Sequence, residues 1–349
     1  MAKGKKSVWF KILVIAGILF ILAGIYVGYK AYTGWKGNVS LNGRKMRSFY
    51  IRTGATFADV KDSMTAGQIL KNIKSFEWLA DYKDYTNHVR PGKYLITDGM
   101  SNNDLINMLK TGRQEPVKLV FNNVRTKYQL AGKISKQLEA DSASILKVLN
   151  DSHYLSKFGF TTDNAIVVFI PDTYEMYWNT SPTQLFEKMN ASYKKFWSKD
   201  RMDKANKAGL TPIQIEILAS IVQEETAQFS EMSTIAGLYL NRLNKGMKLE
   251  ADPTVKFAVG DFTIKRVLKR HLEVESPYNT YKVTGLPPGP ICFPDPRVID
   301  KTLDYEKHDY IYMCAKEDFS GFHNFARTAA EHAANARKYQ NALNLHNIK

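Results

Sequence analysis

Residues 211–226 read TPIQIEILASIVQEET, and this stretch decides how the C-terminal part of the chain folds. Thr211, Pro212 and Gln214 have the spacing of a helix start. A threonine side chain can cap free backbone amides, a proline suits the first turn, and a glutamine three residues after the cap can reach back to complete a capping box. The sequence therefore predicts a helix that begins at Pro212.

The helical period of this segment singles out one acidic residue. Counting 3.6 residues per turn places Glu225 on the apolar stripe that also carries Leu218 and Ile221. The positions that fall roughly opposite this stripe are Glu216, Ser220, Gln223 and Glu224. A carboxyl group packed against aliphatic side chains loses water, which raises its pKa and makes it a proton donor near neutral pH. An ordinary structural salt bridge remains the alternative for Glu225, since such pairs also perturb carboxylates.

The other end of the chain predicts a membrane anchor. Residues 12–29 read ILVIAGILFILAGIYVGY, an uncharged run within the roughly 17 to 25 residues that a helix needs to cross a bilayer. Four lysines and no acidic residue precede it, so the positive-inside tendency leaves residues 1–11 in the cytoplasm and sends the rest across. A cleaved signal peptide is the competing interpretation. The run is, however, longer than the usual apolar core of about 7 to 15 residues and lacks a clear small-x-small cleavage site.

Composition predicts a folded, exported protein with a basic surface. Hydrophobic residues make up 44% of the chain and aromatic residues 12%, which favours folded cores over disorder. The formal net charge is +15, and the four N-terminal lysines account for four of these charges, so +11 belongs to the later chain. Such an excess suits anionic lipid headgroups or cell-wall polymer. Nucleic acid is not an expected partner, because no recognition motif is visible and the basic domains are expected outside the cytoplasm.

Neither a disulfide framework nor a metal site is predicted. The two cysteines, Cys292 and Cys314, can pair in an exported domain or remain free thiols, and the sequence leaves this open. The seven histidines form no HExxH motif, and neither cysteine stands in a close ligand pair. No metal and no other cofactor is therefore expected.

Beyond the anchor, residues 30–49 are expected as a linker and residues 50–114 as a compact α/β unit. The unit combines a short strand, one or two helices, and a second strand followed by a helix that ends at Gly112. The middle part, residues 115–210, contains the apolar run AIVVFIPDTYEMYW. Its β-branched residues predict a buried strand that ends at Pro171.

A long basic helix is expected from Pro182 to about Lys207. In residues 211–349, polar residues cluster in several short stretches. There, a second helix is predicted to begin at Ser230 and to stop before Gly246. The stretches LEADPTV, SPYNTYKVTGLPPGPI and GFHNF are expected as loops. Rigid loops position ligands well, although simple connections are the alternative.

Seven short motifs occur in an order that resembles one known family. They are RPGKY at 90–94, FIPDTYEM at 169–176, ASIVQEET at 219–226, ADPTV at 251–255, SPYNTY at 276–281, GLPPGPI at 285–291, and HNF at 323–325 followed by EH at 331–332. Together they resemble the MltG-type, or YceG-like, endolytic murein transglycosylases over nearly the whole chain. The first motif lies in what resembles the family's small LysM-like domain.

The resemblance implies cleavage of the β-1,4 bond between MurNAc and GlcNAc inside a peptidoglycan glycan strand, leaving a 1,6-anhydro-MurNAc end. The family's catalytic glutamate stands immediately before a threonine. That position is Glu225 here, the residue that helical phase selects independently. The residues expected to contact the sugar chain are Thr226, Asp252, Thr254, Tyr278, Asn279, Thr280, Tyr281 and His323.

The expected protein is α+β, with a single N-terminal transmembrane helix, a small LysM-like α/β domain, and a larger mixed α+β catalytic domain containing a lysozyme-like catalytic helix. It is expected in the bacterial inner (cytoplasmic) membrane, single-pass, with the catalytic domain periplasmic or extracytoplasmic. Peptidoglycan glycan strands are the expected partner. Cell-wall synthesis enzymes remain open as further partners.

Two other functions remain open from the sequence. The first is a muramidase that uses water, with Asp252 or Glu250 as a second carboxylate. The second is a non-enzymatic, membrane-anchored protein that only binds the cell wall. Retention of the Glu-Thr pair at 225–226 argues against the second.

Overall fold

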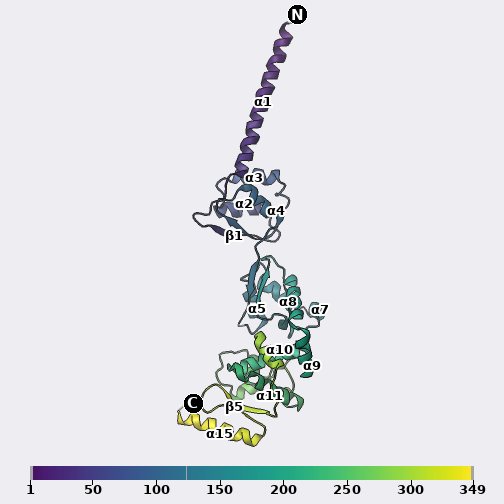
Figure 1. Cartoon of the computed structure of the whole chain (residues 1–349), viewed down its shortest axis with the longest axis vertical. Helices are drawn as coiled ribbons and strands as arrows, with labels where there is room; N and C mark the ends of the chain where they lie inside the picture. Colours follow the sequence, from purple (N-terminus) through teal and green to yellow (C-terminus); the bar gives the residue numbers. More distant parts are fainter. Residues whose placement is uncertain (1–2, 123, 347–349) are drawn as a thin grey trace. The chain divides into compact units, whose positions relative to one another are not determined.

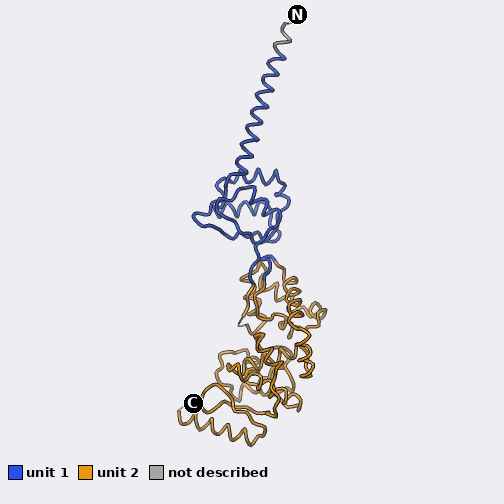
Figure 2. Tube along the Cα trace, viewed as in Figure 1, with its two compact units in different colours: residues 1–118, 175–179 blue, residues 119–174, 180–349 orange. Residues whose placement is uncertain are grey.

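The computed structural model describes residues 3–122 and 124–346. The chain divides into two compact units (Figure 2). Unit 1 comprises residues 1–118 and 175–179, and unit 2 comprises residues 119–174 and 180–349. Both units mix helices with short strands, so the expected α+β class is confirmed.

Unit 1 begins with α1 (Lys3–Trp35), a single long helix (Figure 1). Residues 8–35 of this helix are long and apolar enough to cross a membrane, and the side chains of residues 8–29 are exposed, Phe20 for example by 81%. An apolar surface of this size is typical of a segment that lies in lipid. The first two residues of the expected cytoplasmic tail lie outside the described residues.

The segment 30–49, expected as a linker, contributes to the helix α1 and to the core of unit 1. The helix α1 continues to Trp35, and the chain after it joins the core of unit 1. Val39 is fully buried and forms an isolated bridge with Leu70, while Gly37 pairs with Ser101. Apolar side chains at Val39 and Leu41 explain this docking, because both bury their surface against the unit's helices.

The rest of unit 1 packs three helices with one antiparallel strand pair. The strands β1 (Met46–Ile51) and β2 (Gly92–Thr97) pair with Phe49 opposite Tyr94. The helices are α2 (Phe57–Ala66), α3 (Ile73–Tyr82) and α4 (Asn102–Thr111). Thr56, Asn72 and Ser101 cap them, and Gly112 ends α4 in the left-handed conformation that favours glycine, as expected from the sequence.

The middle part of the chain corrects two sequence expectations. The strands β3 (Val117–Val120) and β4 (Thr173–Met176) pair with each other. The helical elements of this part are α5 (Lys127–Ile134), α6 (Ser142–Leu149), α7 (Ser152–Ser156), the 3₁₀ turn η1 (Ala165–Val168), α8 (Pro182–Phe196) and α9 (Lys199–Lys207). The expected buried strand ending at Pro171 is wrong, because Ala165–Val168 form the buried turn η1. A short apolar run is compatible with either structure, and here Thr161 and Asn164 hold a turn instead.

The expected single helix from Pro182 to Lys207 is two helices. The break falls at Trp197, whose backbone leaves the helical region, and Ser198 then caps α9. Trp197 is 7% exposed and its indole reaches a buried partner, which fixes the break. Phe186, Met189 and Tyr193 recur at helical spacing and are buried along one face of α8.

The helix α10 (Pro212–Glu225) begins as the sequence predicts. Thr211 accepts from the amide of Gln214, and the Gln214 side chain accepts from the amide of Thr211. The helix packs against α9, against α11 (Met232–Asn244), and against α12 (Asp252–Val259) and α14 (Pro296–Leu303). With neighbours on several sides it is a core helix, so the expected polar side is buried as well. Glu216 is 1% exposed and Ser220 0%.

The remaining elements of unit 2 are η2 (Phe229–Glu231), α13 (Lys269–Leu272), the antiparallel pair β5 (Tyr312–Ala315) and β6 (His323–Ala326), and α15 (Ala329–Leu345). The helix expected from Ser230 begins instead at Met232, after η2, and ends before Gly246 as predicted. Of the three expected loops, residues 276–291 contain no helix or strand, whereas Asp252 starts α12 and His323 starts β6. Cys292 and Cys314 are free thiols.

Candidate active site

A cavity of about 270 Å³ opens at the C-terminal end of α10. Its walls come from α10, α11, α12, the strand pair and α15, together with the loop that carries Tyr281. The lining residues are Glu225, Leu238, Tyr239, Arg242, Leu249, Glu250, Asp252, Tyr281, Met313, Cys314, Ala315, His323 and His332. The surface is predominantly polar, with carboxyl, phenol, guanidinium and imidazole groups, which suits a hydroxyl-rich ligand.

Glu225 is the last residue of α10 and is only partly exposed at the cavity wall. Burial raises the pKa of Glu225 above its ordinary value, and the nearby Asp252 carboxylate adds to the rise. His323, a hydrogen bond from Tyr239 and the charge of Lys256 act in the opposite direction. The net result is a carboxyl group that keeps its proton at higher pH than an exposed glutamate and faces open space.

Tyr239, which also lines the cavity, orients that carboxyl group. Its ring is 1% exposed on α11, and its Oη lies 3.1 Å from Glu225 Oε2. Burial raises the pKa of Tyr239 well above the ordinary tyrosine value, so its hydroxyl keeps its proton and donates to Glu225. Because Oε2 accepts this bond, the proton of the acid is best carried by the other oxygen, Oε1.

A second carboxylate sits at the start of α12. Asp252 accepts a 2.7 Å hydrogen bond from the hydroxyl of Tyr281 and lies in the first turn of α12. Burial raises the pKa of Tyr281, so this phenol also acts as a donor. Asp252 and Tyr281 therefore form a fixed polar edge of the cavity.

A third carboxylate, Glu250, is held by a buried arginine. Arg242 donates to Glu250 Oε2 at 3.0 Å and to the backbone oxygens of Lys248, Leu249 and Ile311. Glu250 has a φ of 52°, which is unfavourable for a residue with a side chain. The Arg242 contacts stabilise this conformation and thereby the wall that precedes α12.

Another lining residue, His323, is bound to a buried glutamate. Glu231 in η2 is 5% exposed, and its Oε1 lies 2.6 Å from His323 Nδ1. Its Oε2 accepts the backbone N–H of His323 at 3.1 Å, and Thr226 donates its hydroxyl to Oε1 at 3.1 Å. This arrangement links the residue after Glu225 to the imidazole that faces the cavity.

The structure brings four of the predicted site residues to the cavity and leaves five outside its lining. Glu225, Asp252, Tyr281 and His323 line it. The other five support the walls through buried hydrogen bonds or packing. Thr226 binds Glu231, Thr254 and Thr280 bind each other at 2.8 Å, Asn279 donates to the backbone oxygens of Leu272 and Val274, and Tyr278 packs on Phe257.

Sequence reasoning missed Tyr239, Arg242 and Glu231. Tyr239 lies within the helix predicted between Ser230 and Gly246, and its hydroxyl on the buried face of a helix next to α10 was a usable signal. Arg242 is a cation on a largely buried helix, which was a similar signal. Glu231 gave none, because its partner His323 lies 92 residues away in the chain.

The rival carboxylate Glu224 faces a different cavity, as helical phase predicts. It forms a 2.9 Å ion pair with Arg125 and lines a separate cavity of about 440 Å³ with Gln223 and Cys292. Gln223 accepts the backbone N–H of Asp295 at 2.6 Å. Within residues 3–122 and 124–346, no group of His, Cys, Asp and Glu has the arrangement of a metal site.

Comparison with known proteins now decides the family. Residues 49–338 match the model of the YceG-like family, which is most of the chain. The chain belongs to the YceG-like family. The resemblance expected from the motifs is thereby confirmed.

Among relatives, an endolytic murein transglycosylase of Bacillus subtilis is 28% identical over 314 residues, covering 84% of this chain and 85% of the relative. One of Streptococcus pneumoniae D39 is 26% identical over 95% of this chain, and the alignment covers 66% of that longer relative. The crystal structure of a yceG-like protein from Listeria monocytogenes is 25% identical, with a TM-score of 0.55 over 83% of this chain and 98% of that one.

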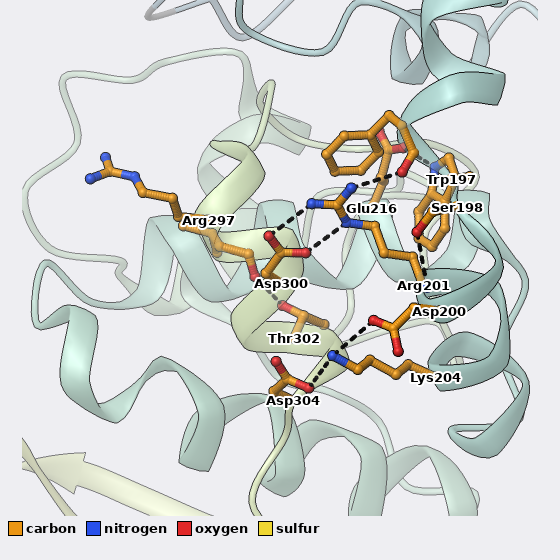
Figure 3. A network of polar contacts seen from close by, with 12 residues as sticks. Trp197, Ser198, Asp200, Arg201, Lys204, Glu216, Arg297, Asp300, Thr302 and Asp304 are labelled. Atoms are coloured by element: carbon orange, nitrogen blue, oxygen red, sulfur yellow. Dashed lines mark hydrogen bonds and ion pairs between the residues drawn. The ribbon is translucent and has the colours of Figure 1, made fainter.

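In this YceG-like chain, the first half of α10 carries a second buried glutamate (Figure 3). Trp197 Nε1 donates to Glu216 Oε1 at 3.0 Å, and burial raises the pKa of Glu216 well above its ordinary value. Next to it, Arg201 forms two hydrogen bonds with Asp300 at 2.8 and 3.0 Å and so ties α9 to α14. Glu216 does not line the cavity at Glu225, and these contacts hold α10 in place.

Proposed function

We propose that this protein is an endolytic lytic transglycosylase that cleaves the MurNAc-β-1,4-GlcNAc bond within peptidoglycan strands, with Glu225 as general acid. The observation that carries the proposal is a carboxyl group of raised pKa, fixed by Tyr239, at the wall of a polar cavity in a YceG-like chain. Relatives named endolytic murein transglycosylases support the substrate class.

The chemistry needs only one acid. Glu225 gives its proton to the departing GlcNAc oxygen, and the C6 hydroxyl of MurNAc attacks C1 to close the anhydro ring. Glu225, now a carboxylate, can accept the proton of that hydroxyl. Internal attack avoids the entropy of recruiting water, and effective concentrations of well-aligned internal groups reach on the order of 10⁵ M or more.

Asp252, Tyr281 and His323 are the proposed sugar contacts in the cavity. Their hydrogen-bonding atoms suit hydroxyl and acetamido groups, and Tyr281 offers a ring as well. The other five residues expected to contact sugar are proposed to hold the walls of the cavity instead. They are Thr226, Thr254, Tyr278, Asn279 and Thr280.

A hydrolytic muramidase is the second candidate, because Asp252 and Glu250 share the cavity with Glu225. A second carboxylate is what an ordinary glycosidase uses to activate water or to attack C1. The two reactions give different ends, since a hydrolytic MurNAc end is heavier by one water than the anhydro sugar. A protein that only binds the wall would give no new ends.

The apolar helix α1 supports a proposal for the cellular setting. We place the protein as a single-pass protein of the bacterial cytoplasmic membrane, with residues 1–11 in the cytoplasm and both units outside. Residues 50–114 are proposed to act as a LysM-like module that binds glycan. An anchor of this kind keeps the cavity near newly made strands, where cell-wall synthesis enzymes are proposed partners.

The test is an end-group analysis with the detergent-solubilised full chain and purified glycan strands. Wild type is expected to produce anhydro-MurNAc ends, and Glu225→Gln to produce them about 10² to 10⁴-fold more slowly. Glu224→Gln is the matched control, because it changes the neighbouring carboxyl group on the other face of α10. Reducing MurNAc ends would establish the muramidase instead, and cleavage by Glu225→Gln at the wild-type rate would remove the acid assigned here.

A further inference from the structure

The threonine of the Glu-Thr pair points to a second proton-transfer group. Thr226 follows the acid directly, yet it is not among the lining residues, and its hydroxyl donates to Glu231. Glu231 in turn holds His323 through both the ring and the backbone N–H. The chain of contacts therefore begins beside the proposed acid and ends at an imidazole in the same cavity.

The hydrogen bonds of Glu231 define the state of this imidazole. Glu231 Oε1 accepts the Thr226 hydroxyl and lies 2.6 Å from His323 Nδ1, and Glu231 Oε2 accepts the His323 backbone N–H. A carboxylate oxygen can only accept a hydrogen bond, so the His323 tautomer that pairs with Glu231 carries its proton on Nδ1. In neutral His323 the lone pair then resides on Nε2, on the side of the ring not held by Glu231.

We propose that His323, held by Glu231, is the base of the reaction. Its Nε2 takes the proton of the MurNAc C6 hydroxyl as that oxygen bonds to C1, while the C1–O4 bond breaks and Glu225 gives its proton to O4. This leaves an imidazolium at His323 and a carboxylate at Glu225, and a proton passes from the first to the second before the next cycle. The inference rests on the proposed function and reassigns only its second proton transfer.

The adjacent residues Glu225 and Thr226 contribute to both proton-transfer groups, the acid and the base. The backbone at the end of α10 fixes Glu225 and Thr226 together, so the acid and the support of the base share one anchor. Glu231 is buried and lies in the turn between α10 and α11, so it stabilises the imidazolium that forms during the reaction. Thr226 acts here as a positioning residue.

Several titratable or charged groups surround His323 and shape its pH response. They come from every element around the cavity: Glu225 from α10, Glu231 from η2, Tyr239 and Arg242 from α11, Glu250 and Asp252 before and on α12, Tyr281 from its loop, Cys314 from β5 and His332 from α15. None of these except Glu231 makes a hydrogen bond to the His323 ring in the described ranges.

The experiment is a pH–rate profile of anhydro-end formation by the full-length protein and its His323→Asn variant. Asparagine keeps a donor near the Nδ1 position for Glu231 but lacks Nε2. The expected loss is about 10²-fold, in the range of one positioned acid-base group, together with loss of the fall in rate at low pH. That fall exists in wild type because a protonated imidazole cannot accept a proton. His153→Asn, an exposed histidine on α7, is the control and is expected to behave as wild type.

Two further variants keep the test decisive if His323→Asn does not fold. Thr226→Val removes the hydroxyl that donates to Glu231, and is expected to lower the rate several-fold and to shift the low-pH fall, whereas Thr226→Ser restores both. In His323→Ala, added imidazole is expected to restore part of the rate. A profile in His323→Asn that keeps its low-pH fall, or a Thr226→Val variant with the wild-type profile, would overturn the inference.

The same assay separates this inference from the function on which it rests. Wild type and Glu225→Gln are measured beside the His323 variants. Cleavage by Glu225→Gln at the wild-type rate removes the proposed acid, whatever His323 does. A slowed Glu225→Gln together with an unchanged His323→Asn profile removes only the base.

Discussion

The two halves of α10 each bury a glutamate, and they differ in what the carboxyl group faces. Glu216 is 1% exposed, accepts a hydrogen bond from Trp197 and is enclosed by the protein core. Burial raises the pKa of both glutamates. The carboxyl group of Glu225, however, opens on a polar cavity with His323 and Asp252. The comparison teaches that burial makes a carboxyl group hold its proton, whereas only access to a cavity lets that proton be used.

The largest expected effect separates the two glutamates by activity. Glu225→Gln is expected to lower the rate of glycan cleavage by about 10² to 10⁴-fold, the contribution of a positioned acid-base group, while the fold remains. Glu216→Gln is expected to keep the rate within about threefold, because a neutral amide can still accept the Trp197 bond. Equal losses in the two variants would break the comparison.

The second prediction concerns the enclosed glutamate. Trp197→Phe removes the donor to Glu216 Oε1 and leaves a buried carboxyl group without that partner. We expect the free energy of unfolding, measured by urea denaturation, to fall by about 1 to 3 kcal/mol. The rate of glycan cleavage by the folded protein is expected to change little. A double variant, Trp197→Phe with Glu216→Leu, is the control. If the cost lies in the unpaired carboxyl group, the double variant recovers stability relative to the single one.

The third prediction sharpens the assignment at Glu225. Tyr239→Phe removes the 3.1 Å hydrogen bond that lowers the pKa of Glu225. The rate is expected to fall about tenfold, corresponding to about 1.4 kcal/mol of transition-state stabilisation. The alkaline fall of the pH–rate profile is expected to move to higher pH, because the acid then keeps its proton longer. An alkaline fall that moves to lower pH would contradict this role.

The smallest expected effect is a change in the pH dependence of stability. The folded-state pKa of Glu216 lies above its unfolded value, so its contribution to stability is complete below the unfolded pKa and is lost as pH rises through the folded pKa. Glu216→Gln has no such loss. Its stability relative to wild type is therefore expected to increase from mildly acidic to alkaline pH, as read from urea midpoints. A constant difference across this range would show that the pKa of Glu216 is the same in the folded and unfolded states.

Local rules predicted the start of α10 and the position of Glu225, because capping and helical phase depend on neighbours in the sequence. The capping box of Thr211 and Gln214 is present as expected. The apolar run of α1 was equally readable, since length and hydrophobicity are sufficient to identify it. In each case the signal and the structure lie within one segment.

The parts that failed depend on contacts between distant segments. The burial of Glu216 and Ser220 requires the helices that cover α10, and no local pattern contains them. The bond between Glu231 and His323 joins η2 to β6. The start of α12 was misread for a different reason, because Asp252-Pro253 fits both a turn and a first helical turn.

The central claim is that Glu225 keeps its proton in the cavity, and its titration tests this most directly. The carboxyl resonance can be followed by NMR in full-length protein labelled with ¹³C-glutamate and assigned by its absence in Glu225→Gln. We predict a midpoint above the ordinary glutamate value of about 4.3, coinciding with the alkaline fall of the cleavage rate. A midpoint at or below the ordinary value in an enzyme that is active at neutral pH would contradict the account.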